Sequence, residues 1–241
     1  GLFQPGGLFL GSLDGRDIYQ HGEDSILTIA PQGAGKSSAL VIPTLLTYPG
    51  SVIVTDPKTE LVEKTAAARR AMGQRVIILN PFRAQIIEEK GVDYGDDGFN
   101  PLSFFRSGSM SKAARSLADI LLPPSSKDDS FFAPAARDVL AGLLYYVLKN
   151  CQGQERSLPF VRAILSLPPD AFRTVLRNEW LQSDDQLTRE NAGKILGHME
   201  SPKQWAGVYL AAAGALAIYE EELASHVSRG DLPPDIFKTE A

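Results

Sequence analysis

The first 80 residues alternate between short apolar runs and stretches with helical spacing. Residues 7–11 and 16–20, joined by the turn residues Asp14 and Gly15, predict a β-hairpin. Apolar runs at 25–30, 51–55 and 75–79 predict three strands, and residues 37–48 and 58–72 between them predict helices. Pro43 is expected to kink or shorten the first of these helices. Strands that alternate with helices predict a parallel sheet with right-handed crossovers.

Beyond Pro101 the pattern becomes helical throughout. Helical spacing recurs at 110–122, 131–150, 159–167, 170–181, 186–199 and 202–227, with almost no strand signal between these segments. We therefore predict an α/β fold in two domains. Residues 1–102 are the N-terminal part of a P-loop nucleotide-binding domain, and residues 103–241 form an all-helical domain.

Composition and charge narrow the class of protein. Hydrophobic residues make up 44% and charged residues 22%, as in ordinary globular proteins. The net charge of −5 provides no global attraction for nucleic acid, so any DNA contact is expected to be local. The single cysteine, Cys151, excludes an internal disulfide framework. No run reaches the roughly 20 apolar residues that span a bilayer, and the start at Gly1 suggests an excised fragment or a processed start, so membrane anchors could lie upstream.

The clearest chemical signal lies between the predicted strand at 25–30 and the predicted helix at 37–48. It is the segment Ala30-Pro-Gln-Gly-Ala-Gly-Lys-Ser37. This segment meets every fixed position of the phosphate-loop pattern G-x-x-x-x-G-K-[ST] except the first, where Ala30 replaces glycine. An alanine fits there only if its φ angle is negative. An ordinary glycine turn at a helix start is the alternative, but the strand–loop–helix context favours the phosphate loop.

Each residue type in this loop has a role in binding ATP and Mg²⁺. Glycines let backbone N–H groups turn toward the phosphates, the Lys36 ammonium reaches the β- and γ-phosphates, and the Ser37 hydroxyl ligates Mg²⁺. We predict that Lys36 is catalytic and that Ser37 is a metal ligand. The predicted nucleotide-binding set is Pro31, Gln32, Gly33, Ala34, Gly35, Lys36, Ser37 and Ser38.

Two carboxylates follow the next strand. Because sites in open α/β sheets lie beyond the carboxyl ends of strands, Asp56 is a candidate metal ligand and Glu60 a candidate catalytic residue that positions water. The equally weighted alternative is that Asp56 caps the next helix and Glu60 lies in its first turn. No later apolar strand ends in Asp-Glu, so the acidic Walker B pair is absent, and the chain is expected to bind nucleotide better than it hydrolyses it.

Other polar residues carry weaker signals. Lys64, Arg69 and Arg70 lie on the second predicted helix, and we interpret them as a solvated face rather than as a DNA contact. His21, His198 and His226 lack metal-ligand spacing and are interpreted as structural or surface residues.

Residues 28–60 resemble the TraG-like coupling proteins of type IV secretion. The resemblance rests on Ala30-Pro31 at the start of the loop, the Val-Ile-Pro-Thr-Leu-Leu helix, the Pro-Gly-Ser-Val strand, the Asp-x-Lys-x-Glu segment and Phe99-Asn-Pro-Leu102. It is dense over residues 5–105 and looser over the helical part. Family members often have glycine where Ser37 stands.

The resemblance implies a RecA-like motor domain with an all-α domain inserted. It also implies a homo-hexamer of the full-length protein at the cytoplasmic face of the bacterial inner membrane, with this portion soluble and the membrane reached only through other segments. Such rings use ATP and Mg²⁺ to deliver DNA, relaxase or effector proteins to the secretion channel. Members place the Walker B strand after the all-α domain.

Two alternatives remain open at this point. The chain is either part of such a motor or a docking module whose ATPase residues lie outside it. A small P-loop kinase is a third possibility, but it needs an acceptor site and a lid arginine cluster, and neither is evident.

Overall fold

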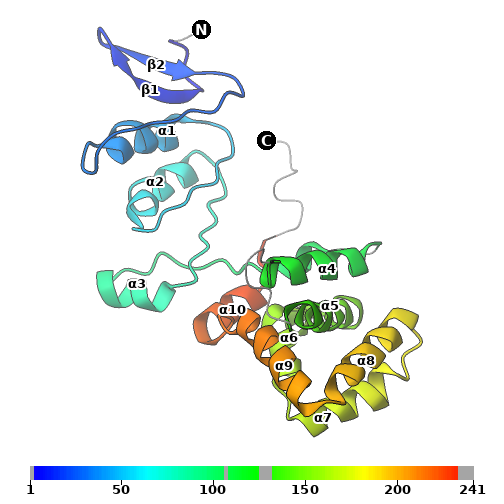
Figure 1. Ribbon diagram of the computed structural model, residues 1–241. Helices are drawn as coiled ribbons and strands as arrows, with labels where there is room; N and C mark the ends of the chain where they lie inside the picture. Colours follow the sequence, from blue (N-terminus) through cyan, green and yellow to red (C-terminus); the bar gives the residue numbers. More distant parts are fainter. Residues whose placement is uncertain (1–2, 106–107, 125–131, 233–241) are drawn as a thin grey trace. The chain divides into compact units, whose positions relative to one another are not determined.

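The computed structural model describes residues 3–105, 108–124 and 132–232. The chain divides into two compact units between Ile78 and Leu79 (Figure 1). Each unit is considered by itself below. The domain boundary predicted at residue 102 stays a prediction. In the structure, residues 79–102 belong with the helices that follow.

The N-terminal unit begins with the predicted hairpin. Strands β1 (Leu8–Leu13) and β2 (Arg16–Gln20) pair antiparallel, with Leu13 opposite Arg16 across the turn. Thr44 ties the hairpin to the first helix, because its hydroxyl accepts the N–H of Phe9 at 3.1 Å. The hairpin prediction is confirmed.

Both predicted helices of this unit are present. The first is a π-helical turn, η1 (Ser37–Val41), followed by α1 (Ile42–Thr47). Pro43 has no N–H to donate to an earlier carbonyl, and the N–H of Ile42 reaches back to Ser37, so the predicted irregularity has a visible cause. The second helix is α2 (Glu60–Ala71).

The three predicted parallel strands are not formed in this structure. Residues 25–30, 51–55 and 75–79 have no strand hydrogen bonding, and the β1–β2 pair is the sheet that the described residues contain. Their apolar side chains remain uncovered: Leu27 is 82%, Ile29 86% and Ile53 85% exposed. A parallel sheet is normally covered on both faces. The predicted pairing of these strands is therefore not seen in this structure, which has a partial α/β arrangement, and the parallel sheet stays a prediction.

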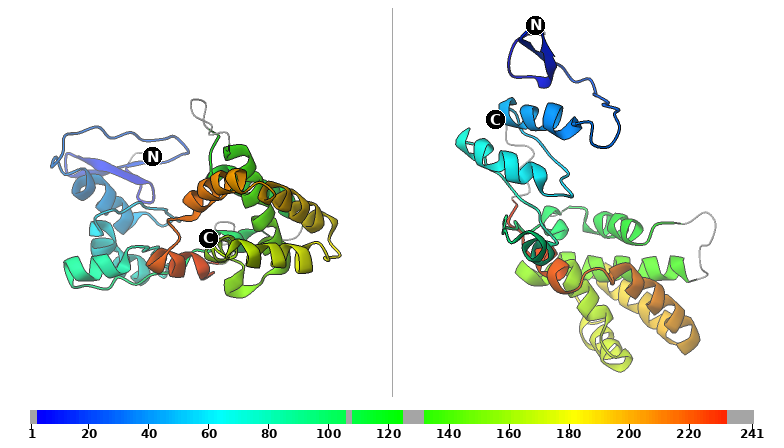
Figure 2. Two further views of the ribbon diagram at one scale, coloured as in Figure 1. Left: turned by 60° about the horizontal axis from the view of Figure 1, so that its bottom comes forward. Right: turned by 90° about the vertical axis from the view of Figure 1, so that its left-hand side faces the viewer.

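The second unit is helical and is built around α5 (Ala133–Asn150). Its core residues Leu140, Leu143 and Leu144 are completely buried. Helices α4, α6, α8 and α9 all pack against α5, and α8 and α9 lie side by side (Figure 2). The bounds of the remaining helices are η2 (Pro101–Phe104), α4 (Met110–Leu121), η3 (Gly153–Glu155), α6 (Leu158–Leu165), α7 (Pro169–Val175), η4 (Leu176–Trp180), α8 (Gln186–Met199), α9 (Pro202–Leu216) and α10 (Glu221–Ser228).

Most of the predicted helices are confirmed, with two corrections. The segment 202–227, predicted as one helical run, breaks after α9, where Glu221 adopts a left-handed φ of 46° and Glu220 pairs with Arg162. The helix α3 (Arg83–Lys90) was not among the predicted elements. Phe131, at the start of the predicted segment 131–150, lies outside the described residues.

Candidate nucleotide-binding site

The loop from Ala30 to Ser38 turns at its glycines. Gly33 and Gly35 have φ angles of 79° and 81°, in the left-handed region that strains other residues. A Cβ atom on Gly35 would also lie 3.3 Å from the Ser38 hydroxyl oxygen. Ala30 is not among the positive-φ residues of the described chain, so it meets the condition under which alanine replaces the usual first glycine.

Lys36 bridges the two ends of this loop. Its Nζ atom donates to the carbonyl oxygen of Ala30 at 2.7 Å and to that of Pro31 at 2.9 Å. The cation therefore lies against the loop backbone, beside the glycine turn. A lysine at this position is the group expected to meet an anion held by the loop.

The helix begins directly after Lys36. The N–H of Ala39 bonds to the carbonyl of Gly35 at 2.7 Å, and the Ser38 hydroxyl bonds to the same carbonyl at 3.1 Å. Ser37 is exposed, and within the described residues its hydroxyl has no hydrogen-bond partner. Lysine, hydroxyl and helix start thus come together as the loop pattern predicts.

The two candidate carboxylates both make structural contacts. Asp56 Oδ2 accepts the N–H groups of Leu61 at 2.8 Å and Val62 at 2.9 Å, which caps the start of α2. Glu60 pairs with Lys64 at 2.6 Å on the surface of α2. The capping interpretation of Asp56 is the one seen here, and its second oxygen, Oδ1, takes no part in the cap. A role for either carboxylate with metal or water stays a prediction.

Arg69 has a role that the sequence did not reveal. It is 6% exposed, and its guanidinium donates to the carbonyls of Leu45 at 3.1 Å, Tyr48 at 2.6 Å and Gly50 at 2.8 Å. Burial lowers its pKa from the usual value. The interpretation of Arg69 as part of a solvated helix face is wrong, whereas its neighbour Arg70 is exposed as expected. Arg69 fixes α2 to the end of α1 and the turn after it.

In the second unit, the buried carboxylate of Asp96 connects the chain segment before the helical bundle to the segment at its end. Asp96 Oδ1 is 2.7 Å from Nδ1 of His226, and it also accepts the N–H of Asn80 at 2.9 Å. Asp96 Oδ2 pairs with Arg229. Nearby, Phe99 and Gly230 form an antiparallel bridge. The two connections of the helical bundle therefore lie next to each other, an arrangement that suits a domain inserted into another.

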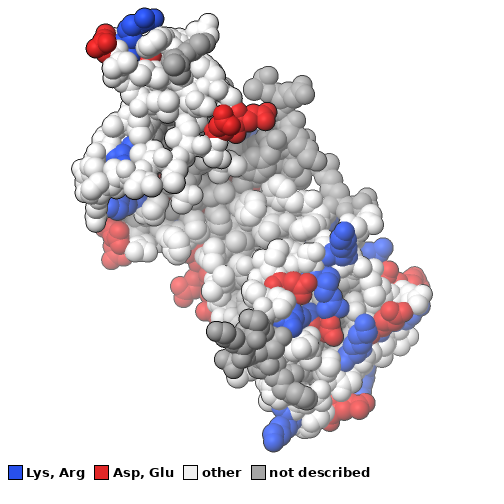
Figure 3. Space-filling model, turned by 45° about the horizontal axis from the view of Figure 1, so that its top comes forward, with Lys and Arg blue, Asp and Glu red and all other residues white. Residues whose placement is uncertain are grey.

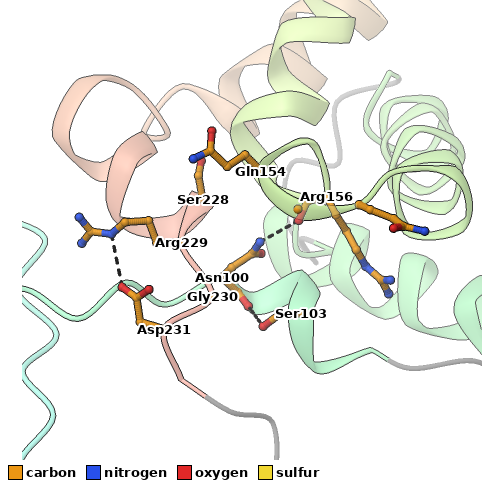
Figure 4. Close-up of a pocket in the computed structure, with 10 residues that line it drawn as sticks. Asn100, Ser103, Gln154, Arg156, Ser228, Arg229, Gly230 and Asp231 are labelled. Atoms are coloured by element: carbon orange, nitrogen blue, oxygen red, sulfur yellow. Dashed lines mark hydrogen bonds and ion pairs between the residues drawn. The ribbon is translucent and has the colours of Figure 1, made fainter.

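A polar cavity of about 550 Å³ lies beside this junction (Figure 4). Its polar groups are largely used within the protein. Asn100 donates to the carbonyl of Arg156 at 2.8 Å, the Ser103 hydroxyl to the carbonyl of Asn100 at 2.7 Å, and the Ser228 hydroxyl to that of Ala224 at 2.7 Å. We interpret these hydrogen bonds as structural contacts that stabilise the junction.

Comparison with known proteins identifies the family. The family described as type IV secretory system conjugative DNA transfer matches residues 4–235. The chain belongs to this family. The resemblance to type IV coupling proteins is thereby confirmed, and the kinase alternative loses its support.

Several curated members of the conjugative DNA transfer family are similar to this chain. The type IV secretion system-coupling protein VirD4 of Bartonella quintana (strain Toulouse) is 29% identical over 203 residues, covering 80% of this chain and 30% of the relative. The conjugal transfer protein TraG of Escherichia coli is 27% identical over 245 residues, covering 93% and 36%. Protein VirD4 of Rhizobium radiobacter is 35% identical over 145 residues, covering 58% and 19%. The chain thus spans about a third of the length of its first relatives. Within the described residues, no helix is long and apolar enough to cross a bilayer.

Proposed function

We propose that this chain is part of an ATP-driven coupling protein that delivers DNA or protein substrates to a type IV secretion channel, and that residues 30–38 bind Mg·ATP. The main support for the proposal is the loop at residues 30–38, in which the Lys36 side chain contacts the backbone carbonyls of Ala30 and Pro31. Lys36 holds its ammonium against a turn made by two left-handed glycines, immediately before a helix, in a member of the conjugative DNA transfer family.

The residues of this loop fit a polyphosphate. The positive φ angles of Gly33 and Gly35 turn the backbone sharply, and a Cβ on Gly33 would meet nothing within 4 Å, so the loop has open space on that side. Lys36 would exchange its carbonyl contacts for phosphate oxygens, and Ser37 would hold Mg²⁺. ATP supplies the phosphoryl-transfer energy when bound. This chain's share is to bind the phosphates and neutralise their charge.

A RecA-like sheet belongs to the same proposal. The apolar segments 25–30, 51–55 and 75–79 alternate with η1–α1 and α2 along the chain, as strands and helices do in a parallel sheet. Their exposed apolar side chains would be buried if the segments paired as strands and a further layer covered them. The adjacent connections of the helical unit support its insertion into that motor domain. A hexameric ring at the inner membrane is proposed from the family resemblance.

The experiment is a titration of a fluorescent ATP analogue with Mg²⁺. We expect binding by the wild-type chain, loss of binding in Lys36→Ala, and no change in Arg70→Ala, which removes an exposed cation from the same unit. Steady-state hydrolysis is expected to be negligible, because the chain lacks a Walker B pair. Equal affinities of the wild type and Lys36→Ala would refute the assignment and favour a docking module without nucleotide.

A further inference from the structure

A second surface lies entirely in the helical unit, between α4 and α8. It is a groove of about 360 Å³ whose floor is α5. Lys112 and Arg115 line it from α4, Ala141 and Tyr145 from α5, and Asn191 and Lys194 from α8. We call this surface the α4–α8 groove. It has no part in the phosphate loop, which belongs to the other unit.

The rims of the α4–α8 groove are cationic. Lys112 and Lys194 are exposed and face the groove from opposite sides, and within the described residues neither has a hydrogen-bond or ion-pair partner. Arg115 forms an ion pair with Asp138, whose Oδ1 lies 2.5 Å from Nη1 of the arginine. Charged residues gather over the helical unit, whereas the visible face of the N-terminal unit is mostly uncharged (Figure 3). Although the chain has a net charge of −5, Lys112 and Lys194 place two positive charges on opposite sides of this groove.

The floor of the groove is small and apolar. Ala141 and Tyr145 are buried, at 8% and 7% exposed, and Leu187 adds a partly exposed aliphatic side chain. The Tyr145 hydroxyl donates to Asp185 at 3.0 Å, which fixes the ring. Gly142 keeps α8 close to α5, since a Cβ there would lie 3.3 Å from Cβ of Asn191. The floor is thus rigid, and its accessible apolar surface is mainly the side chain of Leu187.

We propose that the α4–α8 groove docks an acidic amphipathic helix of a partner protein. Carboxylates of the partner helix pair with Lys112 and Lys194, and its apolar stripe lies on Leu187. A single-stranded nucleic acid fits less well, because base stacking needs an exposed aromatic face and the ring of Tyr145 is buried. Phosphates would meet the rims and leave the aliphatic side chain of Leu187 uncovered. The inference deepens the proposed function by giving the chemistry of one partner, and it does not depend on nucleotide binding.

The test uses the whole chain and fluorescence anisotropy. The probes are a panel of labelled helical peptides about 16 residues long, each with a leucine stripe and glutamates at different helical spacings, together with lysine-for-glutamate counterparts and a labelled oligothymidylate. The groove variant is Lys112→Glu/Lys194→Glu. The control is Arg177→Glu/Lys203→Glu, which makes the same charge change on exposed residues of the same unit that do not line the groove.

We expect at least one acidic peptide to bind, a loss of at least about tenfold in affinity in the groove variant, and less than about a twofold change in the control. Added salt should weaken binding, and the lysine peptides should not bind. The inference is overturned if no acidic peptide binds, if both double variants lose affinity equally, or if only the oligothymidylate responds to the groove variant. Binding of the ATP analogue is measured on the same variants. It should stay unchanged, so failure of this inference and failure of the nucleotide assignment are separate results.

Discussion

Nδ1 of His226 lies 2.7 Å from Oδ1 of Asp96, a residue 130 positions earlier in the chain. Both side chains are less than 10% exposed. The contact joins the first segment of the helical unit to α10, the last helix within the described residues, so these two parts of the unit are held together by a polar contact away from its hydrophobic core. A buried carboxylate is costly unless its oxygens are paired, which gives this contact a measurable share of stability.

His226→Ala is expected to destabilise the helical unit by about 1–3 kcal/mol, because it removes one partner of a buried carboxylate. Urea unfolding followed by circular dichroism measures the change. His198→Ala, in the same unit but without such a contact among the described residues, is the control and should change stability by less than about 0.5 kcal/mol. Limited proteolysis should cut the junction faster in His226→Ala. Equal stability of the two variants would show that the contact is not structural.

Arg69→Met should destabilise the N-terminal unit by roughly 3 kcal/mol, since the carbonyls of Leu45, Tyr48 and Gly50 would lose their donors. Arg69→Lys should recover only part of this, because an ammonium cannot match the fork of a guanidinium. Arg70→Met is the control and should be close to neutral. The measurement is thermal unfolding of the three variants. A neutral Arg69→Met would mean that water satisfies these carbonyls.

Features set by a few neighbouring residues could be predicted from the sequence, and features set by distant ones could not. The turn at Gly33 and Gly35 and the helix α8 were predicted well, because glycine placement and helical spacing act locally. Arg69 was misassigned because its partners are carbonyls 19 to 24 positions earlier. The pairing of Asp96 with His226 leaves no local signal at all. The strands at 25–30 and 51–55 were predicted from apolar residues, but pairing requires neighbours that propensity does not supply.

Stability should fall in acid partly through Asp185. Burial raises its pKa, but bonds from Thr188 and Tyr145 and the charge of Lys149 outweigh this, so its pKa is lowered from 3.8. A lowered folded-state pKa adds stability above the unfolded value, and this is lost as pH falls through the folded value. Asp185→Asn keeps an acceptor for the helix cap but cannot titrate.

We expect the difference in unfolding free energy between the wild type and Asp185→Asn to be largest near neutral pH and to shrink below about pH 3.8. Urea unfolding of both proteins at a series of pH values checks this. Asp184→Asn, an exposed neighbour, serves as the control and should show no such trend. A constant difference across the series would mean that the Asp185 carboxylate is not held in its charged form by folding.

Gly35→Ala should weaken ATP binding far more than it weakens folding. The φ angle of 81° strains any L-residue with a side chain, and the added Cβ would press on the Ser38 hydroxyl. The strain, about 1–3 kcal/mol, falls on an exposed loop that can relax by changing its turn. A changed turn no longer presents Lys36 to the phosphates. Gly15→Ala, at a φ of 76° in the hairpin turn of the same unit, adds similar backbone strain outside the loop and should leave the affinity within about threefold, as judged by titration with the fluorescent ATP analogue. If Gly35→Ala bound the analogue as tightly as the wild type, the left-handed turn would not be needed for binding, and the phosphate-loop assignment would lose its geometric basis.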